Sequence, residues 1–294
     1  MSSAPRWDVE GRNWPGRSHS RFVSTGPVRW HVQVQGPQDA PVLLLLHGTG
    51  AATHSWRDLA PLLADQFRVV APDLPGHGFT RGRPVGGLTM VATARALGDL
   101  LRALEVAPVA IIGHSAGAAL ALRMALDDRA APRAIIGLGA ALLPIPGLAG
   151  VLFPSLARLL FVNPLAPYLA ARMARQPGEV ARFLARSTGS RIDAAGIAGY
   201  AALFGTADHC AGALGMMADW DLAGLRRDLA RVNVPLLLIH GSADAAISLT
   251  DARAATAMIA HARLVALEGL GHLAHEEQPA RIVDLITPFI AEHV

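Results

Sequence analysis

Lysine is missing from this chain of 294 residues, and cysteine and aromatic residues are scarce. All 26 basic residues are arginines scattered among 23 acidic residues, and aromatic residues make up only 5% of the chain. A nucleic-acid surface needs clustered basic residues interleaved with aromatic ones, so this composition argues against nucleic-acid binding. The single cysteine, Cys210, leaves no disulfide within the chain and favours a reducing compartment.

Uninterrupted apolar runs of bilayer length are also missing. The stretch 134–157 carries no charge, but three prolines and four glycines interrupt it. We interpret its first part, 134–138, as a buried strand, and expect at most a membrane-touching patch beyond it. The first 20 residues are polar, with no apolar segment typical of a secretory signal. We therefore expect a cytoplasmic protein with a loose arm over residues 1–20.

Apolar residues are plentiful, at 52% of the chain, and their spacing alternates between two patterns. Short continuous or alternating apolar runs predict strands at 28–35, 41–46, 67–71, 109–112, 134–138, 234–239 and 263–267. Helical spacing predicts helices at 55–64, 88–104, 115–126, 249–260 and 280–291. Strands that alternate with helices predict an α/β core, a mostly parallel sheet with helices on both faces, over residues 21–140 and 223–294.

The alternation stops between residues 141 and 222. Helix-like segments at 155–160, 166–175 and 180–186 are separated there by proline, glycine and asparagine. We expect a helical cap inserted between two strands. Such an insertion lies over the carboxyl edge of the sheet, where open α/β folds bind ligands.

The sequence Gly113-His114-Ser115-Ala116-Gly117 follows an apolar strand and begins a helix. This G-x-S-x-G pattern is typical of a tight strand-to-helix turn that presents a nucleophilic serine hydroxyl. Small neighbours are needed because the turn forces an unfavourable backbone conformation on the serine. The pattern therefore predicts Ser115 as a nucleophile.

A second loop, His47-Gly48-Thr49-Gly50, follows the buried strand at 41–46. A tetrahedral oxyanion needs two backbone N–H donors aimed at one point. We expect the amides of Thr49 and Ala116 to form this oxyanion hole.

A serine nucleophile also needs a base and an acid that orients it. Asp244 follows the strand at 234–239, and His272 follows the strand at 263–267, so both belong to the edge that carries Ser115. The order serine, acid, histidine predicts Asp244 as the acid and His272 as the base. His275 and Glu268 remain alternatives to these two residues.

Other polar residues have structural interpretations. We expect Asp73 to accept backbone hydrogen bonds in its loop and His114 to point away from the nucleophile. We interpret three further histidines as structural: His54, His77 and His240. The histidines lack metal-site spacing, and phosphate-binding and dinucleotide-binding motifs are missing, so we expect no metal and no cofactor.

Together these motifs, with Pro72-Asp73-Leu74-Pro75-Gly76-His77-Gly78, resemble the α/β-hydrolase superfamily over about residues 25–140 and 223–294. A narrower resemblance, to the magnesium-chelatase accessory proteins of bacteriochlorophyll biosynthesis, is carried by 13–17, 29–33, 44–51, 54–59, 114–119, 141–144 and 163–165. The first resemblance implies the α/β-hydrolase fold. The second implies a role near magnesium insertion into protoporphyrin, with contact to the chelatase or to a photosynthetic membrane.

The leading hypothesis is a serine hydrolase acting on an ester or related acyl bond of a small molecule, with a tetrapyrrole as one candidate. Two other functions use the same pocket: porphyrin binding without turnover, and hydrolysis of a carbon–carbon bond. The dehalogenases and epoxide hydrolases of this fold use aspartate where this chain has Ser115. Apolar residues and six arginines of the cap form either a solvated lid or a porphyrin pocket. These residues are Leu142, Leu143, Leu148, Leu152, Phe153, Leu159, Leu160, Phe161, Leu184 and Phe204, and Arg158, Arg172, Arg175, Arg182, Arg186 and Arg191.

Overall fold

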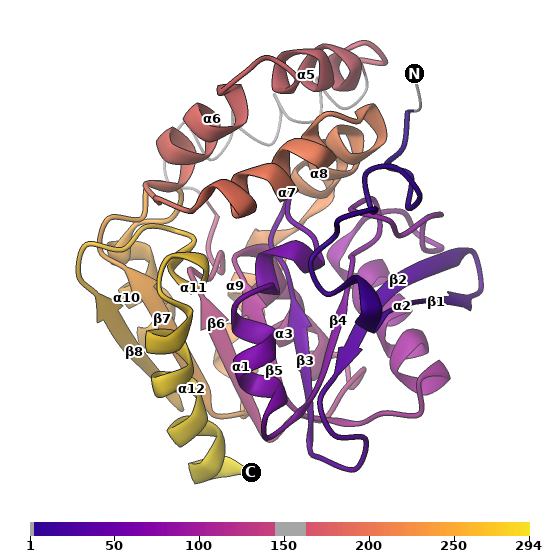
Figure 1. The fold of residues 1–294 in the computed structure, drawn as a ribbon. Helices are drawn as coiled ribbons and strands as arrows, with labels where there is room; N and C mark the ends of the chain where they lie inside the picture. Colours follow the sequence, from indigo (N-terminus) through magenta and orange to yellow (C-terminus); the bar gives the residue numbers. More distant parts are fainter. Residues whose placement is uncertain (1–2, 145–162) are drawn as a thin grey trace.

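The strands of the computed structural model form one twisted sheet, whose order within the described residues, 3–144 and 163–294, is β1-β2-β4-β3-β5-β6-β7-β8 (Figure 1). β2 pairs in antiparallel fashion with both of its neighbours, β1 and β4, and the remaining neighbours are parallel. The strands are β1 (Ser20–Thr25), β2 (Val28–Gln35), β3 (Val42–Leu46), β4 (Arg68–Pro72), β5 (Pro108–His114), β6 (Ala134–Leu138), β7 (Leu236–Gly241) and β8 (Ala262–Leu267). The predicted α/β class and mostly parallel sheet are confirmed.

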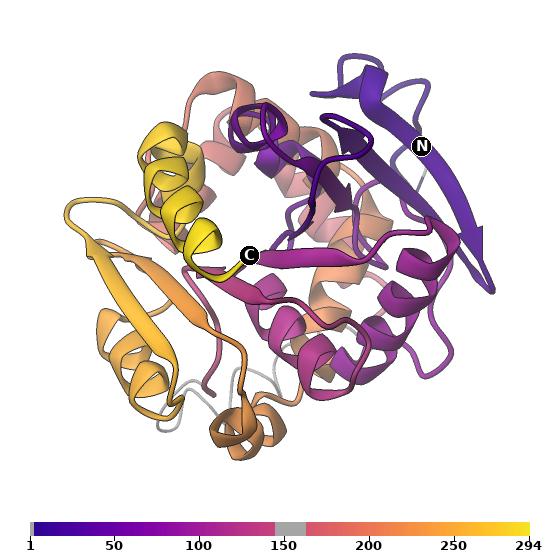
Figure 2. The same cartoon turned by 90° about the horizontal axis from the view of Figure 1, so that it is seen from below.

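Helices cover both faces of this sheet (Figure 2). One face carries α1 and α12, which pack against each other, and the opposite face carries α2 and α3. The helices of the core are α1 (Leu59–Ala64), α2 (Met90–Ala103), α3 (Ala116–Leu126), α9 (Leu222–Asp228), α10 (Leu249–Ala257), α11 (Ala274–Glu277) and α12 (Pro279–His293). Three short 3-10 helices accompany them: η1 (Arg17–His19), η2 (Thr53–Trp56) and η3 (Leu229–Arg231).

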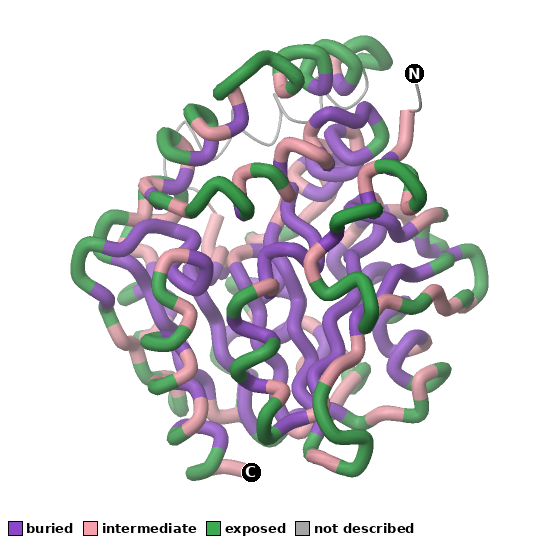
Figure 3. The backbone as a smooth tube through the Cα atoms, in the orientation of Figure 1, coloured by how far each residue is buried: buried purple, intermediate pink, exposed green. Residues whose placement is uncertain are grey.

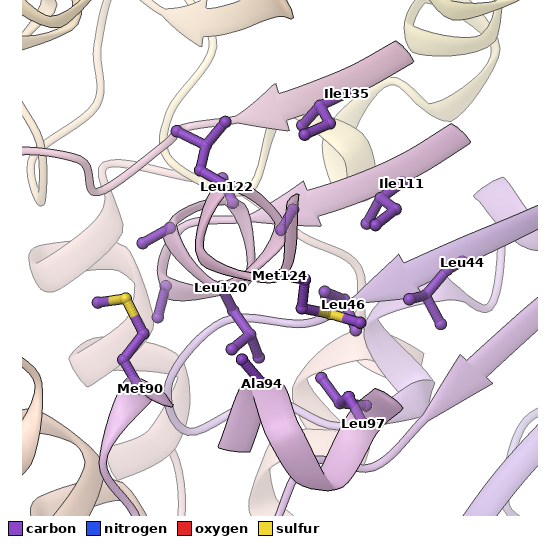
Figure 4. Packing of buried hydrophobic residues seen from close by; sticks show 14 of the residues in the cluster. Leu44, Leu46, Met90, Ala94, Leu97, Ile111, Leu120, Leu122, Met124 and Ile135 are labelled. Atoms are coloured by element: carbon purple, nitrogen blue, oxygen red, sulfur yellow. The ribbon is translucent and has the colours of Figure 1, made fainter. Parts of the chain in front are cut away.

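The central strands are buried on both faces, which explains their continuous apolar sequence. In β3, Leu44 and Leu46 pack towards α2 and α3, whereas Leu43 and Leu45 contribute to the core on the other face. Figure 4 shows the core between the sheet and helices α2 and α3, where apolar residues from both helices and from three strands pack together. Truncating one such leucine to alanine costs about 2–5 kcal/mol in proteins of this kind.

The elements that were predicted within the described residues agree with the observed ones within a few residues, apart from one helix. The helix predicted over 55–64 is instead the 3-10 helix η2 followed by α1. The interruption has a physical cause, because Ser55 and Arg57 direct their side chains at the buried carboxylate of Glu276. The strand β1 and four helices, α7, α8, α9 and α11, were not predicted as separate elements.

The N-terminal residues also differ from the loose arm that we expected. Within the described part of this arm, Trp14 is buried and its Nε1 donates to Thr53 Oγ1 at 2.9 Å. Gln33 Nε2 donates to the carbonyl oxygen of Pro15 at 2.6 Å. These contacts attach the arm to the sheet and to η2.

Between β6 and β7 the chain forms a helical layer over the carboxyl ends of the parallel strands (Figure 1). Its described helices are α5 (Ala166–Ala174), α6 (Glu179–Thr188), α7 (Ala194–Phe204) and α8 (Ala207–Asp219). The helix predicted at 155–160, six of the ten apolar cap residues named above and Arg158 lie outside the described residues. In the described part of the chain, no helix is long and apolar enough to cross a membrane.

Candidate active site

Ser115 occupies the sharp turn between β5 and α3. Its φ of 51° is positive, which is unusual for a residue with a side chain. The flanking glycines leave no room for a side chain: a Cβ on Gly113 would lie 2.4 Å from the Ala118 nitrogen, and one on Gly117 would lie 2.0 Å from the Leu46 carbonyl oxygen. The turn therefore needs the small residues that the G-x-S-x-G pattern supplies, and it places Ser115 at the N-terminus of α3.

The loop after β3 lies against this turn. A Cβ on Gly48 would be 3.0 Å from Ser115 Cβ and 2.7 Å from His114 Nδ1, so glycine permits the close approach. His47 fixes the loop, because its Nε2 accepts from the Leu74 amide at 2.8 Å and its Nδ1 contacts the Gly48 carbonyl oxygen at 2.8 Å. Within the described residues, neither the Thr49 amide nor the Ala116 amide has a protein acceptor. The oxyanion role predicted for these two amides requires N–H groups without a protein acceptor.

Asp244 and His272 come together from the loops after β7 and β8. His272 Nδ1 lies 2.7 Å from Asp244 Oδ2, and the Asp244 side chain is fully buried. The other carboxylate oxygen of Asp244 accepts from the amides of Ala246 and Ile247, each at 2.8 Å. His240 Nε2 lies 3.4 Å from the same carboxylate. These partners hold the acid so that it orients the ring of His272.

The alternatives named for these roles lie elsewhere. His275 is buried and its Nε2 lies 2.9 Å from Ser55 Oγ, not from Asp244. Glu268 is exposed. His114 packs against both His272 and His275, with ring centroids 4.7 Å and 4.5 Å apart, and its Nε2 donates to the His272 carbonyl oxygen at 3.1 Å.

No hydrogen bond joins Ser115 to His272 within the described part of the chain. Space for the histidine depends on Gly139 at the end of β6, because a Cβ there would lie 2.9 Å from His272 Nδ1. In enzymes that pair a nucleophile with a base, the hydrogen bond between the two groups is often long without substrate.

Two cap segments support the site, and sequence reasoning missed both. The Thr188 carbonyl oxygen, at the end of α6, accepts from the amides of His272 at 2.8 Å and of Ala245 at 3.3 Å. Ser190 Oγ accepts from the Leu273 amide at 2.8 Å. Apart from the Ser190 hydroxyl, the groups that make these contacts belong to the backbone, so the sequence gives no signal for them.

The second cap segment is α8, which contacts the loop 47–50 after β3, called the oxyanion loop below for the role predicted for its Thr49 amide. His209 Nδ1 accepts from the Gly78 amide at 3.1 Å, which leaves Nε2 to donate to the Gly50 carbonyl oxygen at 3.0 Å. Thr49 Oγ1 donates to the sulfur of Met216 at 3.2 Å. Phe204 of α7 also lies against this loop, 3.0 Å from where a Cβ of Gly50 would stand.

Burial controls the charge of the surrounding histidines. Desolvation lowers the pKa of His209 to about 4 and that of His54 and His275 to about 3.

Asp73, as predicted, holds its loop: Oδ1 accepts from the Thr53 amide and Oδ2 accepts from the Phe79 amide, each at 2.8 Å. Among residues 3–144 and 163–294, no cluster of three or more metal-ligating side chains occurs.

Comparison with known proteins identifies the family of this chain. Residues 43–285 match the model of the α/β-hydrolase family. The "Magnesium-chelatase 30 kDa subunit" of Rhodobacter capsulatus is 43% identical over 264 residues, which cover 90% of this chain and 92% of that protein.

Solved structures show the same fold at low sequence identity. A haloalkane dehalogenase from Bradyrhizobium elkani aligns with a TM-score of 0.75 at 23% identity, over 93% of this chain and 97% of that one. A carboxylesterase from Bacillus subtilis aligns with a TM-score of 0.73 at 19% identity, over 98% and 96% of the two chains. The extent of the family match and the arrangement of the sheet, the Ser115 turn and the cap lead to one conclusion: this chain is a member of the α/β-hydrolase family, similar over most of its length to a magnesium-chelatase subunit.

Proposed function

We propose that this protein is a serine hydrolase that cleaves an ester or related acyl bond. Ser115 is the proposed nucleophile, His272 the base and Asp244 the orienting acid. The observation that carries the proposal is the 2.7 Å contact between His272 Nδ1 and Asp244 Oδ2, beside a serine held at a φ of 51°. A serine in this turn, with a histidine oriented by a buried acid on neighbouring loops, has the arrangement that acyl transfer requires.

The proposed reaction proceeds in two halves. Ser115 Oγ attacks the acyl carbon and transfers its proton to His272 Nε2, while Asp244 stabilises the imidazolium through Nδ1–H. The amides of Thr49 and Ala116 donate to the oxyanion, and the positive end of α3 adds to this stabilisation. His272 then protonates the departing alcohol. Water, activated by the same histidine, releases the acyl group from Ser115.

A fluorophosphonate probe tests the nucleophile directly. The wild-type protein should be labelled, and Ser115→Ala should not be. His272→Ala should also abolish labelling, whereas His275→Ala should retain it in protein that remains folded by circular dichroism. Labelling of Ser115→Ala, or loss of labelling only in His275→Ala, overturns the assignment.

For the biological role, we propose an accessory function near magnesium insertion into protoporphyrin, with a tetrapyrrole as substrate and the chelatase as a protein contact. The support is the 43% identity to the Rhodobacter capsulatus subunit. The described cap arginines at 172, 175, 182, 186 and 191 are all exposed, which favours a solvated lid over an arginine-lined porphyrin pocket. A porphyrin would then be bound by the apolar residues of the cap and the loop around Gly50.

Absorption spectroscopy tests this substrate class. Addition of protoporphyrin IX or its magnesium form should shift the Soret band with micromolar or tighter affinity, and Ser115→Ala should bind equally well. A well-folded protein that causes no shift at high micromolar porphyrin would leave a hydrolase of another small molecule.

Binding without turnover is the second candidate function. The observation that favours it is that Ser115 and His272 are not hydrogen-bonded in the described part of the chain. Complementation separates the two candidates: a host that carries only Ser115→Ala should lack normal pigment if turnover is needed, and should make normal pigment if the protein acts as a carrier.

A further inference from the structure

Helix α5 exposes large apolar side chains, which is unusual for a helix on a surface that faces water. A surface helix normally buries its large apolar side chains and exposes polar ones. In α5 the buried residues are Pro167 and Ala171, whereas three large apolar side chains of the helix and that of Leu165 just before it are exposed: Tyr168, Leu169 and Met173. Phe183 on α6 is exposed in the same way. We call these five residues the outer cap surface.

The outer cap surface is a concentration of exposed apolar side chains, not scattered instances. All five of its residues are more than half exposed, and they fall within 19 positions of the chain. The other exposed large apolar residues of the described chain are dispersed over the core and the arm: Val9, Leu62, Val85 and Val91. Helices α5 and α6 lie at the end of the molecule farthest from the amino ends of the parallel strands, and much of their outer side is exposed (Figures 1 and 3).

Positive charge accompanies this surface. Residues 163–192 contain five arginines and one acidic residue, Glu179, a net charge of +4 in a chain whose total is +3. Three exposed arginines lie on the two helices beside the apolar residues: Arg172, Arg182 and Arg186. Arg182 pairs with Glu179 one turn earlier, so the charge is only partly neutralised. Large apolar side chains flanked by arginines are the pattern of helices that lie in the interface of an anionic bilayer.

We propose that the outer cap surface docks the protein onto a membrane that contains anionic lipid. The apolar side chains would enter the boundary between headgroups and acyl chains, and the arginines would contact the headgroups. A lipid surface fits better than a protein groove because α5 and α6 form the projecting end of the cap. One cavity among the described residues lies away from this surface, between the N-terminal arm and the β1–β2 end of the sheet, and is lined by Trp7, Phe22 and Arg81 among others.

Docking in this orientation turns the carboxyl edge of the sheet towards the membrane. Phe183 packs edge-on against Phe204, with ring centroids 5.8 Å apart, and Phe204 lies against Gly50 of the oxyanion loop. These contacts connect the outer cap surface to the loop beside Ser115. The docking surface itself does not depend on whether Ser115 is a nucleophile.

Vesicle co-sedimentation tests the proposal with the full chain. The protein should sediment with vesicles of phosphatidylcholine containing 30% phosphatidylglycerol and remain in solution with pure phosphatidylcholine. The double variant Leu169→Gln/Met173→Gln should lose binding at least tenfold. The double variant Arg172→Gln/Arg186→Gln should lose about fivefold per arginine, the effect of roughly 1 kcal/mol per basic residue near an anionic surface.

Matched controls use exposed residues elsewhere. Leu62→Gln/Val85→Gln removes two exposed apolar side chains from other surfaces, and Arg95→Gln/Arg253→Gln removes two exposed arginines; both variants should bind vesicles like the wild type. Failure of the wild type to bind anionic vesicles, or equal losses in the control variants, overturns the proposal. Two results would show that the outer cap surface is covered in another way, in each case when the wild type does not bind vesicles. Fewer dimers of the apolar variant in light scattering would mean that a second copy covers the surface. A lower unfolding temperature of the apolar variant would mean that the chain itself covers it, and either result overturns the proposal.

Discussion

The ring of His209, on cap helix α8, donates from Nε2 to the carbonyl oxygen of Gly50 in the oxyanion loop, with 3.0 Å between the two atoms. Its Nδ1 accepts from the Gly78 amide, so one buried imidazole connects two loops of the core through a residue of the cap. Because Gly50 follows Thr49 directly, the position of a proposed oxyanion donor depends on this side chain.

His209→Ala should therefore lower kcat on a p-nitrophenyl ester by about 10- to 100-fold and leave KM nearly unchanged. Loss of one oxyanion donor costs about 10²–10³ in kcat, and a displaced donor should cost less. His209→Gln should retain part of the activity because its amide can both donate and accept. The exposed His261→Gln is the control, and a KM effect equal to the kcat effect would assign His209 to substrate binding instead.

Asp244→Asn should leave the fold intact and lower kcat by several orders of magnitude. The amide favours the wrong tautomer of His272, and the corresponding change in serine proteases costs about 10⁴. Steady-state kinetics with the same ester measures the effect. The exposed Glu268→Gln should be close to wild type, and the opposite ranking of the two variants would transfer the role of acid to Glu268.

His54 should make the protein sensitive to acid. Both of its ring nitrogens are buried without a hydrogen-bond partner in the described structure, and burial lowers its pKa to about 3. The folded pKa is below the unfolded value of about 6.5, so this stability is present above pH 6.5 and is lost as the pH falls.

Urea unfolding of wild type and His54→Leu at pH 7 and pH 4.5 measures this contribution. Between pH 7 and pH 4.5 the free energy of unfolding of the variant should fall by about 2–3 kcal/mol less than that of the wild type. The reason is that the variant lacks the imidazole that takes up a proton when the wild type unfolds. The exposed His19→Gln should lose as much as the wild type. An identical loss in His54→Leu would mean that the ring finds a partner or becomes exposed.

Glu276 should change the stability of the folded protein with pH in the opposite direction to His54. Its carboxylate is buried, accepts from Ser55 at 2.6 Å and Tyr200 at 2.7 Å, and lies 3.2 Å from Arg57. Desolvation raises its pKa from 4.5 to about 7. A raised folded pKa gives stability that is present below about pH 4.5 and lost as the pH rises through 7.

Glu276→Gln should therefore become more stable relative to wild type between pH 5 and pH 8, by up to about 3 kcal/mol. Chemical unfolding across this range measures the difference, with Glu268→Gln as an exposed control. A difference that does not change with pH would show that Arg57 keeps Glu276 ionised throughout.

The parts that could be predicted from the sequence are those that local patterns determine. β3 and β6 are continuous apolar runs bounded by turn residues, and the Ser115 turn has a fixed spacing of small residues. The order of Ser115, Asp244 and His272 follows from which loops leave the carboxyl edge, and the contact between the last two agrees with it.

Contacts between distant segments could not be predicted in the same way. The break between η2 and α1 depends on Glu276, more than 200 positions away, so helical spacing alone gave a single helix. The support from Thr188 uses its carbonyl oxygen, a group that every residue carries. His209 had no motif around it, and only the packing of α8 against the core reveals its two partners.

The single carbonyl oxygen of Thr188, which accepts from both His272 and Ala245, has a consequence for engineering. A chimera of this fold can be made by exchanging the cap between relatives, with junctions at its two sequence boundaries near 141 and 222. Such a graft would replace the peptide that aligns the acid loop with the histidine loop, even though no proposed catalytic side chain would change. A graft that exchanges the rest of the cap but keeps residues 186–191 of this chain retains that peptide. Chimeras built in this way should keep the relative position of Asp244 and His272, which exchange of the whole cap should disturb.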